Sequence, residues 1–294
     1  MKKGTFIRRN TYPYLFIAPA LILLLVFKIY PIFQSVRLSF IHYNLIIPSK
    51  SEFVGLENFE RLTRDRHVWA ALKNTVHYAL GSVIPGLVIS LILSLLLVEA
   101  WVKFKGTIRA ILFLPYIISI TIAGLVWSFI YNPDFGMLNY LLSFIGVSPI
   151  SWLGDPSLAM WSVIVVAIWK NLGYNIIIWT AGITAISSEY RDAAKVDGAN
   201  YIQELWYVRL PLLKPVFLFL SMLGIINSFQ SFDAIYVMTE GGPIRSTEVI
   251  VYYLWKMAFG EYDLSYAAAI SLLVFGILII LSLLQMWLTR EEKE

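Results

Sequence analysis

The sequence predicts an all-α membrane protein whose helices cross a bilayer six times. Of its 294 residues, 59% are hydrophobic and only 14% are charged. An average soluble domain carries about 25% charged residues, so this chain could not cover a water-exposed surface of its size. The charges also fall between long apolar stretches, and roughly 17–25 apolar residues suffice to span a bilayer. The six expected spans are 13–36, 74–98, 110–133, 157–186, 210–232 and 264–289.

The first span, 13–36, follows a basic N-terminus, as the core of a secretory signal peptide does. Its apolar run from Tyr14 to Ile32 exceeds the usual signal core of about 7–15 residues, and no convincing cleavage site follows it. Lys28 interrupts the run near its expected outer end, where a lysine can extend its ammonium group to the lipid headgroups. The sequence therefore predicts a retained first helix.

The other five spans tolerate very little charge. Asp, Glu, Lys and Arg are absent from 74–98, 110–133 and 264–289. The fourth span contains only Lys170, and the uncharged part of the fifth begins at residue 215, directly after Lys214. Since the Lys214 side chain can reach the membrane interface, the fifth stretch remains long enough to cross.

The distribution of basic residues predicts that both chain ends are cytoplasmic. Lysine and arginine accumulate in the cytoplasmic connections of membrane proteins. The connections on the side of the termini hold 13 of the 23 basic residues, whereas the connection near 134–156 holds none. The terminal members of the cytoplasmic set are Lys2, Lys3, Arg8, Arg9, Arg290 and Lys293. The chain is thus expected to be a multi-pass protein of the cell membrane.

Between the first two spans, residues 56–72 are predicted to form an amphipathic helix on the outer side. An apolar face opposes a charged face at helical spacing. The apolar face is Leu56, Phe59, Leu62, Trp69 and Leu72, and the charged face is Arg61, Arg64, Asp65 and Arg66. Such a helix either lies on the membrane or covers the outer ends of the spans, and the covering role is favoured.

The motifs of enzymes and of self-powered carriers are missing. The dipeptide Gly-Lys never occurs, which excludes a GxxxxGK[ST] phosphate loop. His42, His67 and His77 are scattered without metal-ligand spacing, and the chain has no cysteine and no GxSxG motif. Ion-coupled carriers use intramembrane acids, and the six spans contain neither Asp nor Glu. We therefore expect no catalytic residue and no metal or cofactor on this chain, and an energy source supplied by a partner.

The connection 187–209 is predicted to be a compact helix-turn-helix on the cytoplasmic face. Ser187 is a favourable N-cap residue, and Glu189 and Asp192 complement the positive end of the helix macrodipole. Gly198 can adopt the positive φ that reverses the chain after a helix. An amphipathic loop resting on the headgroups is the alternative to a docking surface. The small residues that would make such a surface flat are Ala193, Ala194, Gly198 and Ala199.

This connection and its flank resemble a known motif. Residues 192–199 read DAAKVDGA, and Leu210-Pro211 follows. The pattern is similar to the EAA loop of binding-protein-dependent ABC importer permeases, which docks into a cleft of the ATPase subunit. Asp192 stands where Glu is usual, which keeps the charge on a shorter side chain, and Trp206 stands where Phe is commoner. We refer to 187–209 as the coupling loop.

Further segments resemble carbohydrate-type members of the same family, in the same order along the chain. They are FVGLENF (53–59), FLPYIIS (113–119), YNPDFGMLN (131–139), WKNLGYN (169–175), FDAIYVMTEGGP (232–243) and YAAAISLLVF (266–275). The resemblance implies the fold of a type I ABC importer permease in a prokaryotic cell membrane. It also implies that the chain translocates a sugar, expected to be a di- or oligosaccharide, and is not itself an enzyme.

The resemblance further implies a set of partners. They are a second permease subunit, expected to be distinct but related, two cytoplasmic ABC ATPases that use ATP and Mg²⁺, and an extracytoplasmic sugar-binding protein. No nucleic acid is expected among them. Docking to the ATPase is assigned to Glu189, Asp192, Ala193, Ala194, Asp197, Gly198, Ala199, Leu210 and Pro211.

Polar residues within the fourth and fifth spans are the candidates for a substrate pathway. Asn171, Tyr174 and Asn175 share one helical face because they are three and four residues apart. The fifth span repeats this spacing, and family members bind sugar near mid-membrane on these two helices. The candidate pathway is Tyr174, Asn175, Asn171, Asn227, Ser228, Gln230 and Ser231. Hydrogen bonding between helices accounts for each residue singly about as well.

Three questions stay open at the level of sequence. Lys170 could pair with a partner subunit, bond backbone carbonyls or line the pathway, and a structural role is favoured. The segment TEGGP (239–243) has the composition of a turn and could contact the binding protein, although a plain loop is the simpler interpretation. The alternative functions are a permease for a polyol or glycerol phosphate, a self-sufficient secondary carrier and an intramembrane enzyme. An anionic solute would favour clustered basic residues, and only Lys170 is available.

Overall fold

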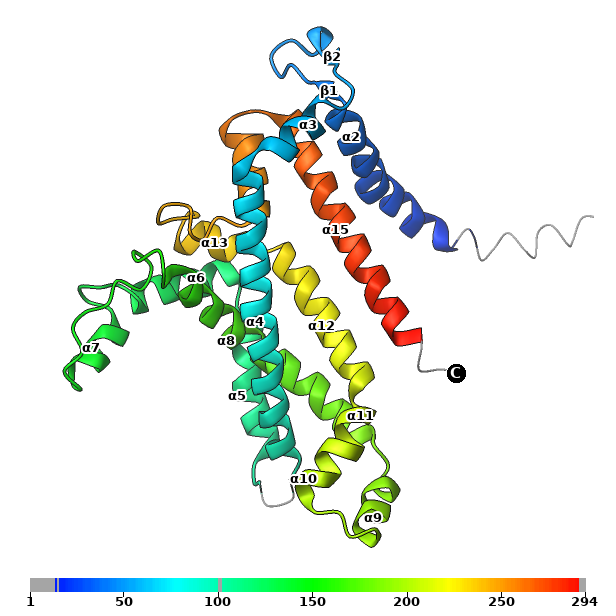
Figure 1. Ribbon diagram of the computed structural model, residues 1–294, viewed down its shortest axis with the longest axis vertical. Coiled ribbons are helices and arrows are strands. Elements are labelled where there is room, and N and C mark those ends of the chain that lie inside the picture. The colour runs from blue at the N-terminus through cyan, green and yellow to red at the C-terminus, as the bar shows by residue number, and fades with distance from the viewer. Residues whose placement is uncertain (1–13, 15, 100–101, 291–294) are drawn as a thin grey trace, which may run out of the picture. The chain divides into compact units, whose positions relative to one another are not determined.

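The structure is a computed structural model that describes Tyr14, residues 16–99 and residues 102–290 (Figure 1). The basic residues Lys2, Lys3, Arg8, Arg9 and Lys293, and the side chain of Arg290, lie outside this description. Helices dominate the described residues, which confirms the all-α fold class. The chain divides into two compact units, Met1–Asp65 with Leu254–Phe275 and Arg66–Tyr253 with Gly276–Glu294.

The first unit opens with a long apolar helix and a small ribbon. A helix over Phe16–Ser39 contains the π-helical turn η1 (Leu25–Ile29) and α2 (Tyr30–Ser39). It is followed by β1 (Ile41–His42), the 3₁₀ turn η2 (Pro48–Lys50), β2 (Glu52–Phe53) and α3 (Glu57–Arg64). The strands pair antiparallel, with Ile41 opposite Phe53.

The C-terminal part of the first unit contains η4 (Lys256–Gly260) and the beginning of α15 (Leu264–Arg290). Arg61 of α3 joins this part to the N-terminal part. Its guanidinium lies 2.6 Å from the Asp263 carboxylate and 3.8 Å from the centre of the Tyr266 ring. The Tyr266 hydroxyl in turn donates to Asp65 at 2.7 Å.

The second unit contains most of the remaining helices. They are α4 (Arg66–Val98), α5 (Lys105–Ile117), α6 (Ile120–Ile130), α7 (Met137–Ser143), α8 (Ala159–Ala185), α9 (Ser188–Val196), α10 (Tyr201–Glu204), the π-helical turn η3 (Leu205–Arg209), α11 (Leu210–Leu212), α12 (Lys214–Phe229) and α13 (Asp233–Met238). The helix α14 (Ile250–Trp255) runs across the boundary between the units. Small residues allow these helices to approach closely. A Cβ on Gly81 of α4, for example, would stand 2.7 Å from the Ile164 side chain of α8.

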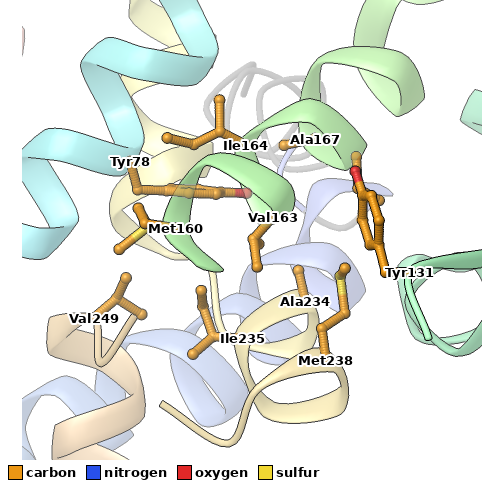
Figure 2. Packing of buried hydrophobic residues seen from close by; sticks show 11 residues of the cluster. Tyr78, Tyr131, Met160, Val163, Ile164, Ala167, Ala234, Ile235, Met238 and Val249 are labelled. Carbon is orange, nitrogen blue, oxygen red and sulfur yellow. The ribbon is translucent and has the colours of Figure 1, made fainter. Parts of the chain in front are cut away.

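A hydrophobic cluster joins α4, α8 and α13 within the second unit. Figure 2 shows Tyr78 beside Met160, Val163 and Ile164, with Ile235 nearby. Val163 and Ile235 are fully buried. The cluster fixes α8 between its neighbours, and α8 carries the polar residues discussed below.

Four of the described helices are long and apolar enough to cross a membrane, and two bent pairs raise this number to six. The unbroken helices are Phe16–Ser39, Arg66–Val98, Ala159–Ala185 and Leu264–Trp287. The bent pairs are Lys105–Ile117 with Ile120–Ile130, at 96°, and Tyr201–Leu212 with Lys214–Phe229, at 62°.

The expected continuous helix over 110–133 is broken in the structure. Ile118 and Ser119 both adopt extended backbone, with ψ of 138°. Pro115 lies in the last turn of α5, where it has no N–H to donate to the Ile111 carbonyl and so weakens that turn. The expected fifth span, 210–232, likewise bends at Leu213, between Pro211 and Pro215.

The expected single helix over 56–72 is also two helices in the structure. α3 ends at Arg64, Asp65 is extended with ψ of 103°, and α4 begins at Arg66. Trp69, expected on the same apolar face as Leu56, therefore belongs to the long helix α4. The amphipathic pattern was real over α3, where Leu62 is buried and Arg64 is exposed.

Candidate functional site

A cavity of about 310 Å³ opens between α4, α5, α8 and α12 of the second unit. No Asp, Glu, Lys, Arg or His lines it. Its polar lining consists of Tyr78 and Ser82 from α4, Tyr116 from α5, Asn171, Tyr174 and Asn175 from α8, and Asn227 and Ser228 from α12. Neutral hydroxyls and amides thus share the cavity with aliphatic side chains.

Close helix packing shapes this cavity. A Cβ on Gly224 of α12 would stand 3.0 Å from a methyl group of Val83 on α4, so these helices approach closely beside it. The hydroxyls of Ser82 and Ser228 are 3.4 Å apart across the same pair of helices. On the other side, a Cβ on Gly173 of α8 would come within 2.2 Å of the Leu112 carbonyl oxygen of α5. Only glycine permits that approach of backbone to backbone.

Two tyrosines form an aromatic wall. The Tyr116 and Tyr174 rings are stacked, with their centres 4.9 Å apart and their planes at 18°. Tyr116 sits at the end of α5, next to the break that separates α5 from α6. The position of the Tyr116 ring in this wall therefore depends on what fixes the backbone between α5 and α6.

The Lys170 side chain bonds to the backbone at the break between α5 and α6. Its ammonium group donates to the carbonyl oxygens of Tyr116, at 3.1 Å, and Ile118, at 2.7 Å. It also lies 5.5 Å from the centre of the Tyr116 ring. Of the three roles open at the level of sequence, the structure shows the bonding of backbone carbonyls, and Lys170 is not among the residues that line the cavity.

The structure divides the predicted pathway residues into two groups. Five of the seven line the cavity: Asn171, Tyr174, Asn175, Asn227 and Ser228. Gln230 and Ser231 do not, because α12 ends at Phe229 and the helical spacing stops there. Sequence reasoning missed Tyr78, Ser82 and Tyr116. Tyr78 and Ser82 are four residues apart on one helix, a spacing that a search for polar faces in the second span could have found.

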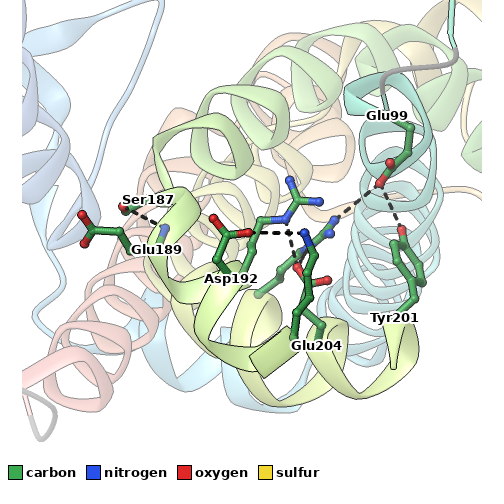
Figure 3. A network of polar contacts seen from close by, with 9 residues as sticks. Glu99, Ser187, Glu189, Asp192, Tyr201 and Glu204 are labelled. Carbon is green, nitrogen blue, oxygen red and sulfur yellow. Dashed lines mark hydrogen bonds and ion pairs between the residues drawn. The ribbon is translucent and has the colours of Figure 1, made fainter. Parts of the chain in front are cut away.

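The coupling loop is built from well-capped short helices. The Ser187 side chain accepts a hydrogen bond from the Glu189 N–H (Figure 3). Asn200 and Gln203 form a reciprocal capping box. Gly198 has φ of +79°, and the Ala199 N–H bonds the Ala194 carbonyl at 2.9 Å, as in a Schellman turn. The expected helix-turn-helix is therefore present.

The predicted docking residues differ in their exposure. Glu189, Asp192, Ala193, Asp197, Gly198 and Pro211 are exposed, whereas Ala199 and Leu210 are half-buried. Ala194 is buried, so it is not part of the flat outer surface expected of it. The surface of the loop instead carries large, mainly apolar side chains. Exposed among them are Tyr190, Val196, Ile202, Trp206 and Tyr207.

A buried ion network holds the coupling loop together, and sequence reasoning did not find it. Arg209 is only 2% exposed, and its Nε donates to Glu204 at 2.8 Å. Arg191 donates to the same carboxylate oxygen at 3.0 Å. Glu204 directly precedes the π-helical turn η3 and Arg209 is its last residue, and this wider turn relates residues five apart. An α-helical reading of the sequence would place these two side chains on different faces.

The network keeps Glu204 ionised. Burial raises the pKa of its carboxyl, but the hydrogen bonds and positive charges of Arg209 and Arg191 lower the pKa overall, below the ordinary glutamate value. A lowered carboxyl pKa stabilises the fold above the ordinary value, and that contribution is lost as the pH falls through the lowered pKa. The loop therefore retains this stabilisation throughout the neutral range.

Long apolar helices around a polar, uncharged cavity, joined to a capped helix-turn-helix, are typical of the membrane-embedded subunit of a transporter. The chain belongs to the family of binding-protein-dependent transport system inner membrane components, whose family model matches residues 75–293. This confirms the resemblance carried by the EAA-like loop and identifies the chain as an ABC importer permease.

Relatives along nearly the whole chain agree with this assignment. The probable ABC transporter permease protein YurN of Bacillus subtilis (strain 168) is 38% identical, over 96% of this chain and 97% of that protein. The trehalose/maltose transport system permease protein MalF of Thermococcus litoralis is 33% identical, over 96% and 94%. A crystal structure of a bacterial ABC transporter involved in the import of the acidic polysaccharide alginate contains a chain of the same fold, with a TM-score of 0.87 at 23% identity over 100% of both chains.

Proposed function

We propose that this permease imports an uncharged di- or oligosaccharide, and the observation that carries the proposal is the neutral, aromatic-walled cavity. The Tyr116–Tyr174 pair offers ring surface for the apolar face of a pyranose. The amides of Asn171 and Asn227 and the hydroxyls of Ser82 and Ser228 line the same space. Amides and hydroxyls both donate and accept hydrogen bonds, as sugar hydroxyl groups require.

The lack of charged side chains in the cavity lining distinguishes a neutral sugar from the nearest alternative, an anionic solute. A glycerol phosphate or an acidic sugar would bring a negative charge into a cavity that contains no basic side chain, and burying an unpaired charge is costly. Lys170 cannot easily supply the charge, since its ammonium group is engaged by two carbonyls. The alginate importer shares the fold at low identity, so its acidic substrate does not carry over. The relatives include both a trehalose/maltose permease and an sn-glycerol-3-phosphate permease, so the neutral substrate rests on the lining of the cavity.

The exposure of the amides supports a second permease subunit. Asn171 and Asn227 are exposed although they lie within apolar helices. Lipid tails cannot satisfy such groups, so they face water or another polar protein surface. We propose that a related permease subunit completes the pathway at this face.

The remaining partners follow from the coupling loop. Its exposed acids and apolar side chains are proposed to dock on two cytoplasmic ATPase subunits, which bind ATP and Mg²⁺, so that this chain holds no cofactor. An extracytoplasmic binding protein delivers the sugar, both chain termini are cytoplasmic, and the chain is a non-catalytic, multi-pass component of the cell membrane. ATP binding then favours one of two conformations of the permease pair, and the coupling loop transmits that preference.

Two measurements test the proposal. Gentle-detergent purification of the tagged chain from its native membrane should recover a P-loop ATPase and a second six-span permease. Cells producing the complex should take up labelled neutral oligosaccharides, and unlabelled uronate oligosaccharides or glycerol phosphate should compete poorly. Repeated recovery of the chain alone would favour a secondary carrier, and stronger competition by the acidic solutes would contradict a neutral substrate.

A further inference from the structure

Arg209 is the most deeply buried charged side chain of the coupling loop, and it reaches beyond the loop. In addition to Glu204, its guanidinium lies 3.6 Å from the carboxylate of Glu99, the residue that follows α4. The Tyr201 hydroxyl approaches the same carboxylate at 3.5 Å, and the Arg209 guanidinium lies 5.2 Å from the centre of the Tyr201 ring. Figure 3 shows Glu99 facing Tyr201 and the loop.

Apolar packing supports this junction. Leu205, the first residue of η3, packs in one cluster with Leu95 and Val98 from the last turn of α4. Leu213, at the bend before α12, is fully buried in the same cluster. The coupling loop and the end of α4 therefore contribute to one hydrophobic cluster, together with residues of α8 and α12.

The helix that receives this contact also lines the cavity. Tyr78, Ser82, Val83 and Gly86 of α4 all face it. α4 is one helix of 33 residues with Pro85 inside it. Gly86 lies on the coupling-loop side of this proline, so displacement of the helix end reaches Gly86 directly and reaches Tyr78 and Ser82 through the proline turn. A continuous physical route thus runs from the coupling loop through Arg209 and Glu99 to the cavity wall.

We infer that Arg209 and Glu99 are positioning residues that transmit movement of the coupling loop to α4, and through α4 to the cavity. This inference rests on the proposed function, in which an ATPase moves the loop. Arginine suits the role because its planar guanidinium can engage two carboxylates at once. Arg209 holds Glu204 within the loop and Glu99 outside it, so the loop and the helix end move together.

The primary test is Glu99→Gln, because Glu99 is partly exposed and its loss leaves the buried Arg209–Glu204 pair intact. The whole complex is reconstituted in proteoliposomes with its binding protein, and sugar molecules imported per ATP hydrolysed are counted. We expect this ratio to fall about fivefold or more, the lower end of ordinary coupling factors, while the ATPase co-purifies as in the wild type. Glu99→Asp, which keeps the charge, should restore part of the ratio.

A second variant acts from the other side of the contact. Arg209→Lys keeps a positive charge for Glu204 but lacks the fork that reaches both carboxylates, and it should lower the same ratio. Arg64→Gln is the matched control, because it breaks an exposed ion pair with Glu60 in the other compact unit and should leave the ratio unchanged.

The possible outcomes separate the inference from the function on which it rests. An unchanged ratio in both assembled variants would overturn the inference, as would a loss of uptake that only follows a loss of bound ATPase. A wild-type complex that hydrolyses ATP without importing sugar would instead overturn the proposed function. A reduced ratio in Glu99→Gln and Arg209→Lys, with normal assembly, supports the route through α4.

Discussion

At the scale of single residues, Gly198 matters for the backbone conformation of the turn between α9 and α10 and not for any side-chain contact. Its φ of +79° lies in the left-handed region, and no atom lies within 4 Å of the position a Cβ would take. A larger side chain would therefore fit in space but would strain the backbone, by about 1–2 kcal/mol. The strain would be relieved by opening the turn between α9 and α10, which would displace the docking surface.

We expect Gly198→Val to lower sugar uptake strongly while the ATPase remains bound, because the altered turn would change the orientation of α9 relative to α10. Uptake in cells and co-purification of the ATPase measure the two effects separately. Gly146→Val is a matched control: Gly146 has φ of +78° and equally open surroundings, but it lies in the 144–150 connection. Full transport in Gly198→Val would remove the docking role of this turn.

The cavity residues offer a second test at this scale. Tyr174→Ala and Asn227→Ala each remove a group from the cavity wall, and the apparent KM for sugar uptake should rise about two- to tenfold, since a hydrogen bond contributes about 0.5–1.5 kcal/mol. Gln230→Ala lies outside the lining and should alter the KM much less. Equal effects in all three variants would show that the cavity is not the sugar site.

At the scale of elements, hydrophobic length predicted the helices but not their breaks. A chain in lipid must satisfy its own backbone, so an uncharged stretch such as 74–98 indicates a helix, and α4 covers it. The break at Ile118 and Ser119 could not be predicted in this way, because the carbonyls it frees are satisfied by Lys170, 52 residues further along the chain from Ile118. Such a partner appears only when α5 and α8 have packed.

The candidate site shows the same limit. Helical spacing correctly grouped Asn171, Tyr174 and Asn175, because all three lie on one uninterrupted helix. The same rule failed beyond Phe229, where the helix ends. Tyr116 was missed because it enters the cavity from a different helix, and the sequence contains no local signal of that meeting.

The broken helix leads to a prediction about Lys170. Lys170→Met leaves the carbonyls of Tyr116 and Ile118 without their donor, and the loss of a hydrogen bond costs about 0.5–1.5 kcal/mol. We expect a lower Tm for the purified complex and a raised KM for sugar, because the Tyr116–Tyr174 wall loses its support. Lys170→Arg should retain most of both properties.

The other lysine within an apolar helix serves as the control. Lys28 is exposed on the helix Phe16–Ser39, and Lys28→Met should change neither the Tm nor the KM appreciably. If Lys170→Met also leaves both unchanged, the break is held by helix packing alone.

At the scale of the whole molecule, the second unit places the cavity and the coupling loop on shared helices. α4 lines the cavity and ends beside the loop, and α8 carries Asn171 and Asn175 and is followed by α9. The same helices therefore belong to both sites, and a rigid displacement of the loop cannot leave the cavity wall unchanged. This arrangement suits the proposed role, in which the permease responds to a separate ATPase subunit.

The orientation of the chain in the membrane is the last prediction, and the absence of cysteine makes it directly measurable. Ser148 lies in the connection that lacks basic residues, and Val196 lies in the coupling loop; both are exposed. In the cysteine-free background, Ser148→Cys should react with a membrane-impermeant maleimide added to intact spheroplasts. Val196→Cys should react only after the membrane is opened, because basic connections stay cytoplasmic. The reverse pattern would place the coupling loop outside the cell, where no ATPase could reach it, and would contradict ATP-driven import at its first step.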